Sequence, residues 1–193
     1  MERFATIFIK LRNGFLENGK KTGKTWILMK NRQMIPGPDF DEASPGWELT
    51  WPFPDTARPG SFVSGDPEGQ RIRIKYYRRK EDGALVGKAW FGPDAEGPPG
   101  HAHGGSMSAV LDEAMGGSAW LAGYAVVAVR LIIDLRRMLP LGTAVFFEGS
   151  VEKVDGRKIH TRGKLTNAAG EVYAESQGLF IVLSQERFRG QSV

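Results

Sequence analysis

Residues 97–123, GPPGHAHGGSMSAVLDEAMGGSAWLAG, decide the predicted fold. A loop rich in proline and glycine leads into a stretch whose apolar residues recur at three- and four-residue intervals. This spacing predicts a helix over 106–123 with one buried face. Gly116-Gly117 weaken the helix internally, and Gly123 is its expected end. The buried stripe consists of Met107, Val110, Leu111, Ala114, Ser118 and Leu121.

Strand patterns stand on both sides of this helix. Two runs, 71–78 and 84–91, precede it and are joined through the turn Glu81-Asp82-Gly83. Four more are expected to follow as a meander, and connections this short force antiparallel pairing. The predicted class is α+β, an antiparallel sheet of about six strands wrapped around one long central helix. The four later runs are 126–139, 144–154, 157–166 and 171–183.

The rest of the chain divides by composition. Residues 1–68 are expected to form an N-terminal amphipathic helix and an irregular arm packed on the body, 69–187 the main domain, and 188–193 a tail. Seven of the 11 prolines lie between Pro36 and Pro67, so a central strand is not expected there. The first residues carry an apolar stripe at helical spacing, which fits either a helix docked on the body or a helix on a membrane surface.

Composition narrows the function classes. The chain has 193 residues, no cysteine and a net charge of +4, with a calculated pI of 9.4. The charge suits an anionic small molecule but is too weak to indicate nucleic acid. No apolar run approaches the about 20 residues of a spanning helix, and the pattern of the first residues does not predict a secretory signal. We therefore expect a cytoplasmic protein without membrane contact.

The motif His103-Gly104-Gly105 stands at the expected start of the helix. A helix N-terminus presents unpaired N–H groups and partial positive charge, and glycines let a ligand approach the backbone. The motif therefore indicates an oxyanion site that could polarise a carbonyl. The alternative is that the glycines only make a tight turn from loop to helix.

Two adjacent acids, Asp112 and Glu113, lie in the middle of the same helix. An unpaired carboxylate beside a buried stripe is costly, which favours a functional group. Asp112 follows Leu111 at the border of the buried face. Glu113 fits better the alternative of an acid at the solvent edge, paired with a base.

The spacing of the motif has a consequence for assembly. Gly104 and Asp112 are eight residues apart in the sequence, or about 12 Å along a helix axis. A base and an oxyanion donor that serve one carbonyl must lie within about 3 Å of the reacting atoms or of one bridging water. If both act on one substrate, Gly104 of one chain must meet Asp112 of another, so the protein must be at least a dimer.

With these motifs in place, the chain resembles the hotdog acyl-CoA thioesterases of the phenylacetate-degradation type. It looks most like the fatty acyl-CoA thioesterases called superfamily members four and five. The resemblance covers about residues 69–185 and includes the later segments LPLGT, VEKVDGRKIHTRG and VYAESQGLFIVL. It implies a hotdog fold and thioester hydrolysis. It also implies an oxyanion N–H from Gly104, a loop shaped by His103, and Asp112 as general base or nucleophile.

The same resemblance assigns substrate contacts. Gly105, Ser106 and Met107 extend the helix start, and the acyl chain is expected between helix and sheet beside Met107. Arg157 and Lys158 match a segment that the family uses around the CoA phosphates. Arg136 is a further option, although each cation also fits a solvated strand edge. The position where the family commonly has a water-holding threonine is Ala128 here, and a methyl group cannot bond water.

The leading hypothesis is hydrolysis of a medium or long fatty acyl-CoA by a homodimer or a dimer of dimers. CoA enters only as part of the substrate, so no cofactor is expected, and His101, His103 and His160 lack metal-site spacing. One alternative is an enoyl-CoA hydratase or dehydratase that uses His103 with Asp112. The other is a non-catalytic acyl-CoA or lipid-binding protein, which Ala128 keeps open.

Overall fold

A computed structural model describes residues 34–53 and 60–183, which belong to a compact unit spanning Gln33–Val193. The expected N-terminal amphipathic helix and the tail 188–193 lie outside these residues. In the described ranges, no helix has the length and apolar character needed to cross a membrane.

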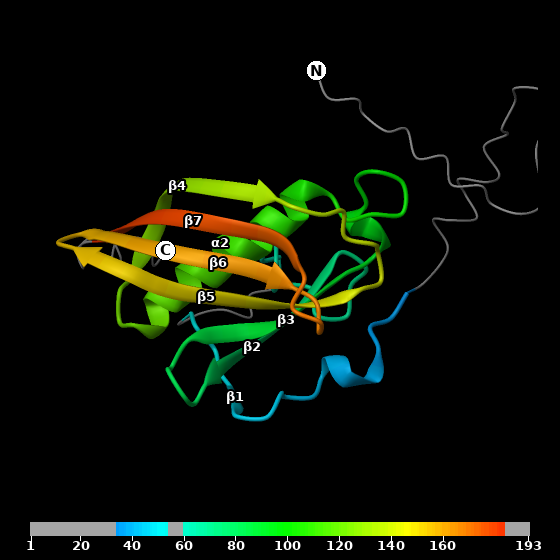
Figure 1. Ribbon diagram of the computed structural model, residues 1–193, viewed down its shortest axis with the longest axis horizontal. Coiled ribbons are helices and arrows are strands. Elements are labelled where there is room, and N and C mark those ends of the chain that lie inside the picture. The colour runs from blue at the N-terminus through cyan, green and yellow to red at the C-terminus, as the bar shows by residue number, and fades with distance from the viewer. Residues whose placement is uncertain (1–33, 54–59, 184–193) are drawn as a thin grey trace, which may run out of the picture. The chain divides into compact units, whose positions relative to one another are not determined.

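The core of the fold is one antiparallel sheet of seven strands with the order β1-β2-β3-β5-β6-β7-β4 (Figure 1). Each predicted strand is present within a few residues of its expected bounds. The strands are β1 (Trp47–Leu49), β2 (Ile72–Arg79), β3 (Leu85–Phe91), β4 (Val126–Leu135), β5 (Ala144–Asp155), β6 (Lys158–Thr166) and β7 (Val172–Val182).

The long helix α2 (Gly104–Leu121) lies across one face of this sheet (Figure 1). It crosses β5 so closely that a Cβ on Gly149 would lie 2.1 Å from the carbonyl oxygen of Ala114. The chain leaves the helix through Gly123, whose φ of 89° suits glycine. Helix side chains such as Val110 and Leu111 are fully buried against the sheet, so the predicted helix and its buried stripe are confirmed. Two 3₁₀ turns, η1 (Pro38–Phe40) and η2 (Pro93–Ala95), complete the described elements.

The seventh strand, β1, was not predicted. It lies in the proline-rich arm, where only irregular structure was expected, and pairs with β2 through Trp47↔Arg79 and Leu49↔Tyr77. It is three residues long and sits at the sheet edge. Proline is tolerated at such an edge because one side of the strand needs no ladder hydrogen bond. The arm is also held by Lys88, whose ammonium donates to the carbonyls of Asp39 and Glu42.

The predicted meander of the last four strands is wrong for β4. This strand pairs with β7 at the far edge, whereas β5 continues from β3. The helix carries the chain across the sheet face, so the next strand starts at the opposite edge. Only β5, β6 and β7 form a meander.

A bulge in β4 changes which residues share a face. Ala128 pairs with Phe180 and Arg130 with Leu179, which leaves Val129 as the extra residue. Phe180 is buried on the helix side, so Ala128 faces the helix together with Leu131. The sequence pattern had placed Ala128 on the other face, with Arg130.

Candidate active site

The first turn of α2 leaves one backbone donor unused. His103 is the N-cap residue, and its Nδ1 accepts a hydrogen bond of 2.9 Å from the N–H of Gly105. The N–H groups of Ser106 and Met107 donate to the carbonyl of His103 at 2.9 and 3.3 Å. In residues 34–53 and 60–183, no acceptor contacts the N–H of Gly104. This N–H, at the positive end of the helix dipole, is available to an anionic oxygen.

Gly104 lies directly against the end of β4. A Cβ at this position would be 2.6 Å from Leu135 Cδ1. Gly104 lines a surface cavity of about 240 Å³ whose other walls include Met107, Arg136 and Arg137. The close packing explains a glycine here, and the cavity leaves room for a ligand at the free N–H.

The two acids leave the helix on different flanks, because consecutive residues are about 100° apart around the axis. Gly116, one turn after Asp112, lies where a Cβ would be 3.3 Å from Phe180 of β7. Gly117, one turn after Glu113, lies where a Cβ would be 2.7 Å from Leu85 of β3. Asp112 therefore faces the β7–β4 side of the sheet, and Glu113 faces the β2–β3 side and the arm.

Asp112 is half-buried, and no hydrogen bond or ion pair reaches its carboxylate from the described part of the chain. Burial raises the pKa of Asp112 above its usual value, because removal from water disfavours the charged form. A carboxylate with this environment is a better proton acceptor than a solvated aspartate.

Glu113 is held in place by bonds that the sequence did not reveal. The hydroxyl of Tyr76, which is 1% exposed, donates a very short hydrogen bond to its carboxylate. Ser64 of the arm is a further hydrogen-bond partner. Burial still raises the pKa of Glu113, although both hydrogen bonds oppose the shift. The expected pairing of Glu113 with a base at the solvent edge is therefore wrong. Its partners are the hydroxyl groups of Tyr76 and Ser64, which fits the supporting role that the sequence favoured.

The predicted cations fall into two groups. Arg136 and Arg137 lie beside Gly104 and are paired with acids, Arg136 with Asp134 and Glu175 at 3.4 Å each. Arg157 is on the β5–β6 turn and donates to the carbonyl of Val182 at 3.1 Å. Its neighbour Lys158 is exposed.

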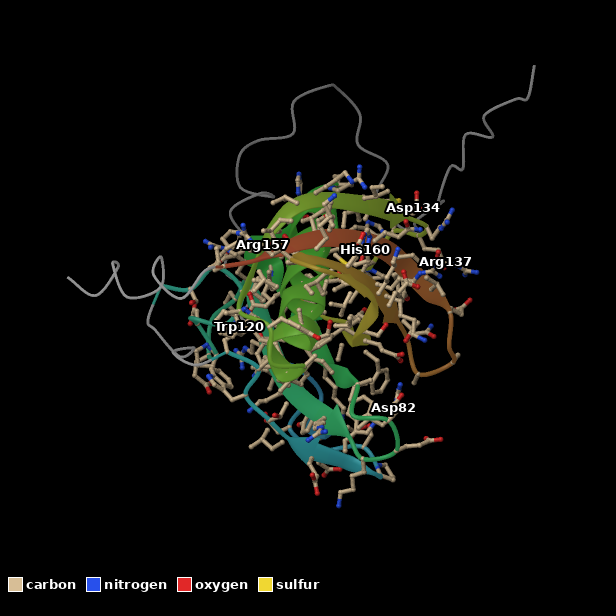
Figure 2. All side chains as sticks on the ribbon, turned by 90° about the vertical axis from the view of Figure 1, so that its left-hand side faces the viewer. Asp82, Trp120, Asp134, Arg137, Arg157 and His160 are labelled. Atoms are coloured by element: carbon tan, nitrogen blue, oxygen red, sulfur yellow. The ribbon has the colours of Figure 1, made fainter. Side chains whose placement is uncertain are left out.

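These two groups are separated along the sheet. The β5–β6 turn lies at the left in Figure 1, near the start of β4, and β4 runs away from it. The ten residues of β4 between them span about 30 Å. Figure 2 likewise shows Arg157 well apart from Arg137. In one chain, the structure does not bring Arg157 and Gly104 together.

The expected space for an acyl chain between helix and sheet is filled. Met107 is 3% exposed, and Leu111 and Met115 are 0% exposed within the core. Ser106 is also buried, whereas Gly105 is exposed. In the described core, Met107, beside which the acyl chain was expected, and its helix neighbours Leu111 and Met115 are packed into the core clusters.

The three described histidines lie in local contacts of the fold. His101 Nδ1 lies 2.9 Å from the carbonyl oxygen of Pro99, and His103 caps the helix. His160 is half-buried on β6, where its neighbours Ile159 and Thr161 point into the core. Within the described ranges, no group of three or more His, Cys, Asp or Glu side chains is placed to hold a metal ion.

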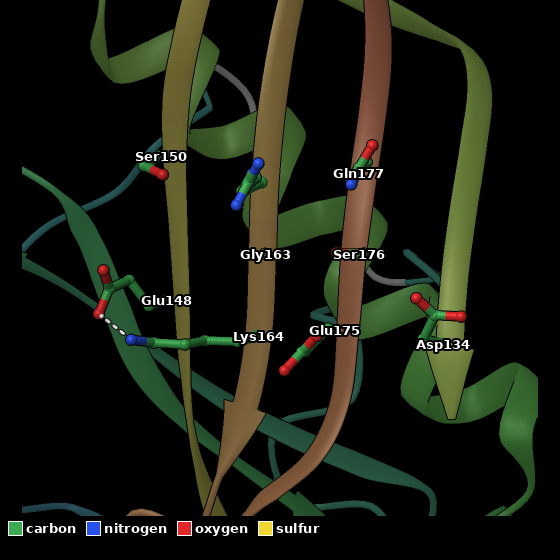
Figure 3. A pocket seen from close by; sticks show the side chains of 9 residues that line it. Asp134, Glu148, Ser150, Gly163, Lys164, Glu175, Ser176 and Gln177 are labelled. Atoms are coloured by element: carbon green, nitrogen blue, oxygen red, sulfur yellow. Dashed lines mark ion pairs between the residues drawn. The ribbon is translucent and has the colours of Figure 1, made fainter. Parts of the chain in front are cut away.

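A second cavity, of about 340 Å³, lies on the opposite face of the sheet (Figure 3). Its side chains come from β5, β6, β7 and β4 and have mixed charge. Lys164 pairs with Glu148 at 3.4 Å, and Glu148 also accepts from Arg79. These charges largely neutralise one another, and the sheet separates them from α2.

The sequence and the fold are similar to those of thioesterases. Residues 99–174 match the model of the thioesterase superfamily. The fold is the hotdog fold that solved members of this superfamily share, so the predicted fold and resemblance are confirmed.

Among curated proteins, the chain is 37% identical over 101 residues to the acyl-coenzyme A thioesterase THEM5 of Mus musculus, with 49% of this chain and 39% of that protein covered. It is 32% identical over 120 residues to THEM4 of Xenopus laevis, with 61% and 54% covered. The chain thus spans about half the length, or less, of these relatives. A solved structure, BH2602 of Bacillus halodurans with CoA, is 29% identical with a TM-score of 0.52 and covers 58% of this chain and 75% of its own.

Proposed function

We propose that this protein hydrolyses an acyl-CoA thioester to a free acid and CoA. The observation that carries the proposal is one helix with an unsatisfied N–H at Gly104 and an unpaired, half-buried carboxylate at Asp112. The N–H would stabilise the oxyanion that forms on the thioester carbonyl. Asp112 would activate water or attack directly. The names of the curated relatives support this chemistry.

The proposed enzyme works as a homodimer whose sites are shared between subunits. In one helix, Gly104 and Asp112 are about 12 Å apart along the axis, which is too far for both to act on one thioester carbonyl. Strand β4 supports a dimer, because it is a sheet edge with exposed apolar side chains on both faces, including Ile132 at 50% on the outer face and Leu135 at 52% on the helix face. An unpaired apolar edge of this kind favours pairing with a second strand.

Antiparallel pairing of two β4 strands across a twofold axis would also bring the cations to the site. The start of one β4 strand would lie beside the end of the other. Arg157 and Lys158, near the start of β4, would then approach Gly104 of the second subunit. They would face the phosphates of CoA there, together with Arg136. The structure of BH2602 with CoA supports CoA as the ligand class.

The first test compares two neighbouring acids. Asp112→Asn should lower kcat on dodecanoyl-CoA by at least about 100-fold, since a positioned base contributes about 10²–10⁴. Glu113→Gln keeps the shape of its side chain and should retain kcat within a few-fold. Release of CoA is measured with a thiol reagent. Near wild-type turnover in Asp112→Asn would reject this aspartate as the essential group.

The second test asks whether the site is shared. Subunits that carry Asp112→Asn are mixed and refolded with subunits that carry Gly104→Pro, which removes the proposed donor. Only the mixed dimer contains an intact Gly104 opposite an intact Asp112. Random pairing should restore about a quarter of wild-type activity, because half of the dimers each hold one intact site of two. A site built within one chain would give no recovery.

One observation favours a second candidate, a binding protein without turnover. Ala128 faces the helix at the place where a hydroxyl would hold water, and its methyl group cannot do so. Tight binding of acyl-CoA without thiol release would indicate this function. The hydratase alternative gains no support, because His103 caps the helix. A fatty acyl substrate and a cytoplasmic location stay predictions.

A further inference from the structure

A separate cavity, here called the arm pocket, lies between the N-terminal arm and β2. Its volume is about 640 Å³, within the range of about 300–1,000 Å³ that small-molecule sites occupy. Three chain segments form its walls. The lining residues are Leu49, Thr50, Trp51, Ser64, Gly65, Pro67, Ile74, Lys75 and Tyr76.

The walls of the arm pocket are mainly apolar and are partly open to water. Leu49 is 77% exposed and Trp51 is 47% exposed. The ring of Trp51 meets the buried ring of Tyr76 edge-on, with centroids 5.6 Å apart. Apolar side chains exposed around a concave site indicate a surface that a ligand covers.

The inner end of the arm pocket is polar but has no unpaired charge. Tyr76 and Ser64 line the pocket, and both hydrogen-bond the carboxylate of Glu113 behind it. An apolar chain end meets no uncompensated group there. An anionic head group at this end would lie close to the negative charge of Glu113, which repels it. The head group therefore belongs at the opposite, open end.

Lys75 borders the pocket between Ile74 and Tyr76, but adjacent residues of a strand point to opposite faces of the sheet. Its ammonium, which lies 2.9 Å from Asp41 Oδ1, is therefore on the face away from Tyr76. The anionic end of a ligand stays in water at the open end of the pocket.

We propose that the arm pocket binds one linear acyl chain, with the methyl end toward Tyr76 and the anionic head group in water at the open end. The choice of an acyl ligand rests on the proposed function, which makes acyl chains both substrate and product. The filled core between helix and sheet adds to the argument, because Leu111 and Met115 leave no room for a chain there. The ligand is either the free fatty acid or the acyl part of acyl-CoA.

The binding test uses 12-bromododecanoic acid, whose bromine quenches tryptophan fluorescence on contact. Saturable quenching is expected in the full-length protein, and Trp51→Phe should remove most of it. Leu49→Glu places a negative charge against the chain and should weaken binding at least about tenfold. The matched control is Ile35→Glu, because Ile35 is 76% exposed but outside the pocket; it should leave the affinity within about twofold. Absence of binding, or quenching that survives both Trp51→Phe and Leu49→Glu, overturns the proposal.

Competition separates the two ligands. If the pocket accepts the acyl part of acyl-CoA, dodecanoyl-CoA displaces 12-bromododecanoic acid from the Asp112→Asn protein, whereas acetyl-CoA does not. If it accepts the free acid alone, neither thioester displaces the probe. Because the fluorescence test needs no turnover, a chain that binds the acid but releases no thiol contradicts the proposed hydrolysis and leaves the arm pocket standing.

Discussion

The Nδ1 atom of His103 accepts a hydrogen bond of 2.9 Å from the N–H of Gly105. This contact caps the helix and uses one of its first donors, while the neighbouring N–H of Gly104 has no acceptor in the described residues. One side chain therefore both stabilises the helix start and selects which donor faces the cavity.

Removal of the cap should cost stability. His103→Ala leaves the N–H of Gly105 unbonded and should lower the free energy of unfolding by about 1 kcal/mol, the usual value for a lost cap. His103→Asn supplies a different capping oxygen and should recover most of the loss. Denaturant titration of the three proteins measures the effect. Equal stability of His103→Ala and the wild type would contradict the role as a cap.

The contact between Gly104 and Leu135 predicts a rescue. Gly104→Ala puts a methyl group 2.6 Å from Leu135 Cδ1, so either the Leu135 side chain or the helix start must move, and kcat should fall a few-fold. Leu135 is 52% exposed on the β4 edge, so Leu135→Ala should leave the fold intact, and its own effect on kcat is measured alone. The double variant removes the clash and should regain most of the activity, which a double-mutant cycle quantifies. If the changes in kcat of the two single variants simply add in the double variant, this contact is not the cause of the loss.

A hydroxyl at position 128 should increase turnover. Ala128 faces the helix after the bulge in β4, and Ala128→Thr would add a group able to hold water in the site. Ala128→Val has nearly the same shape without the hydroxyl, so it is the matched control. We expect kcat to rise several-fold in Ala128→Thr only. An equal change in both variants would assign the effect to packing.

Asp112 should lower stability at neutral pH. Burial raises its pKa above the usual 3.8, so between these two values the folded protein holds a proton that the unfolded chain has lost. Stability from this group is therefore highest at low pH, falls as pH rises through that window, and stays reduced above it. Asp112→Asn carries no charge to desolvate and should have a higher Tm at pH 7. The difference in Tm should shrink as the pH approaches 3.8, and a constant difference would contradict this origin.

A charge on the β4 edge should weaken the proposed dimer. Ile132 is 50% exposed, and Ile132→Lys places an ammonium where the second strand would pair. Sedimentation should then show more monomer at micromolar concentration, and specific activity should fall on dilution. Leu49→Lys alters an exposed residue, 77%, of β1 at the opposite edge of the sheet. It should leave the assembly unchanged.

Local patterns were enough for most of the fold. The apolar spacing along α2 and the glycine turns predicted the helix and six strands because both signals depend on neighbours within a few residues. Strand β1 escaped prediction because Trp47–Leu49 is too short for a periodic pattern and lies among prolines. The place of β4 beside β7 also escaped, since strand order depends on where the helix delivers the chain.

For the candidate site, the sequence by itself determined the helix start at His103-Gly104-Gly105, the two acids eight and nine residues after Gly104, and the spacing on which the proposed shared site rests. Only the tertiary structure decided how the acids differ. Glu113 is bonded by Tyr76 from 37 residues away, whereas Asp112 faces the other flank without a partner. The bulge likewise turned Ala128 toward the helix. Helical spacing follows from local backbone geometry, but the partner of a buried carboxylate depends on which distant strand packs against it.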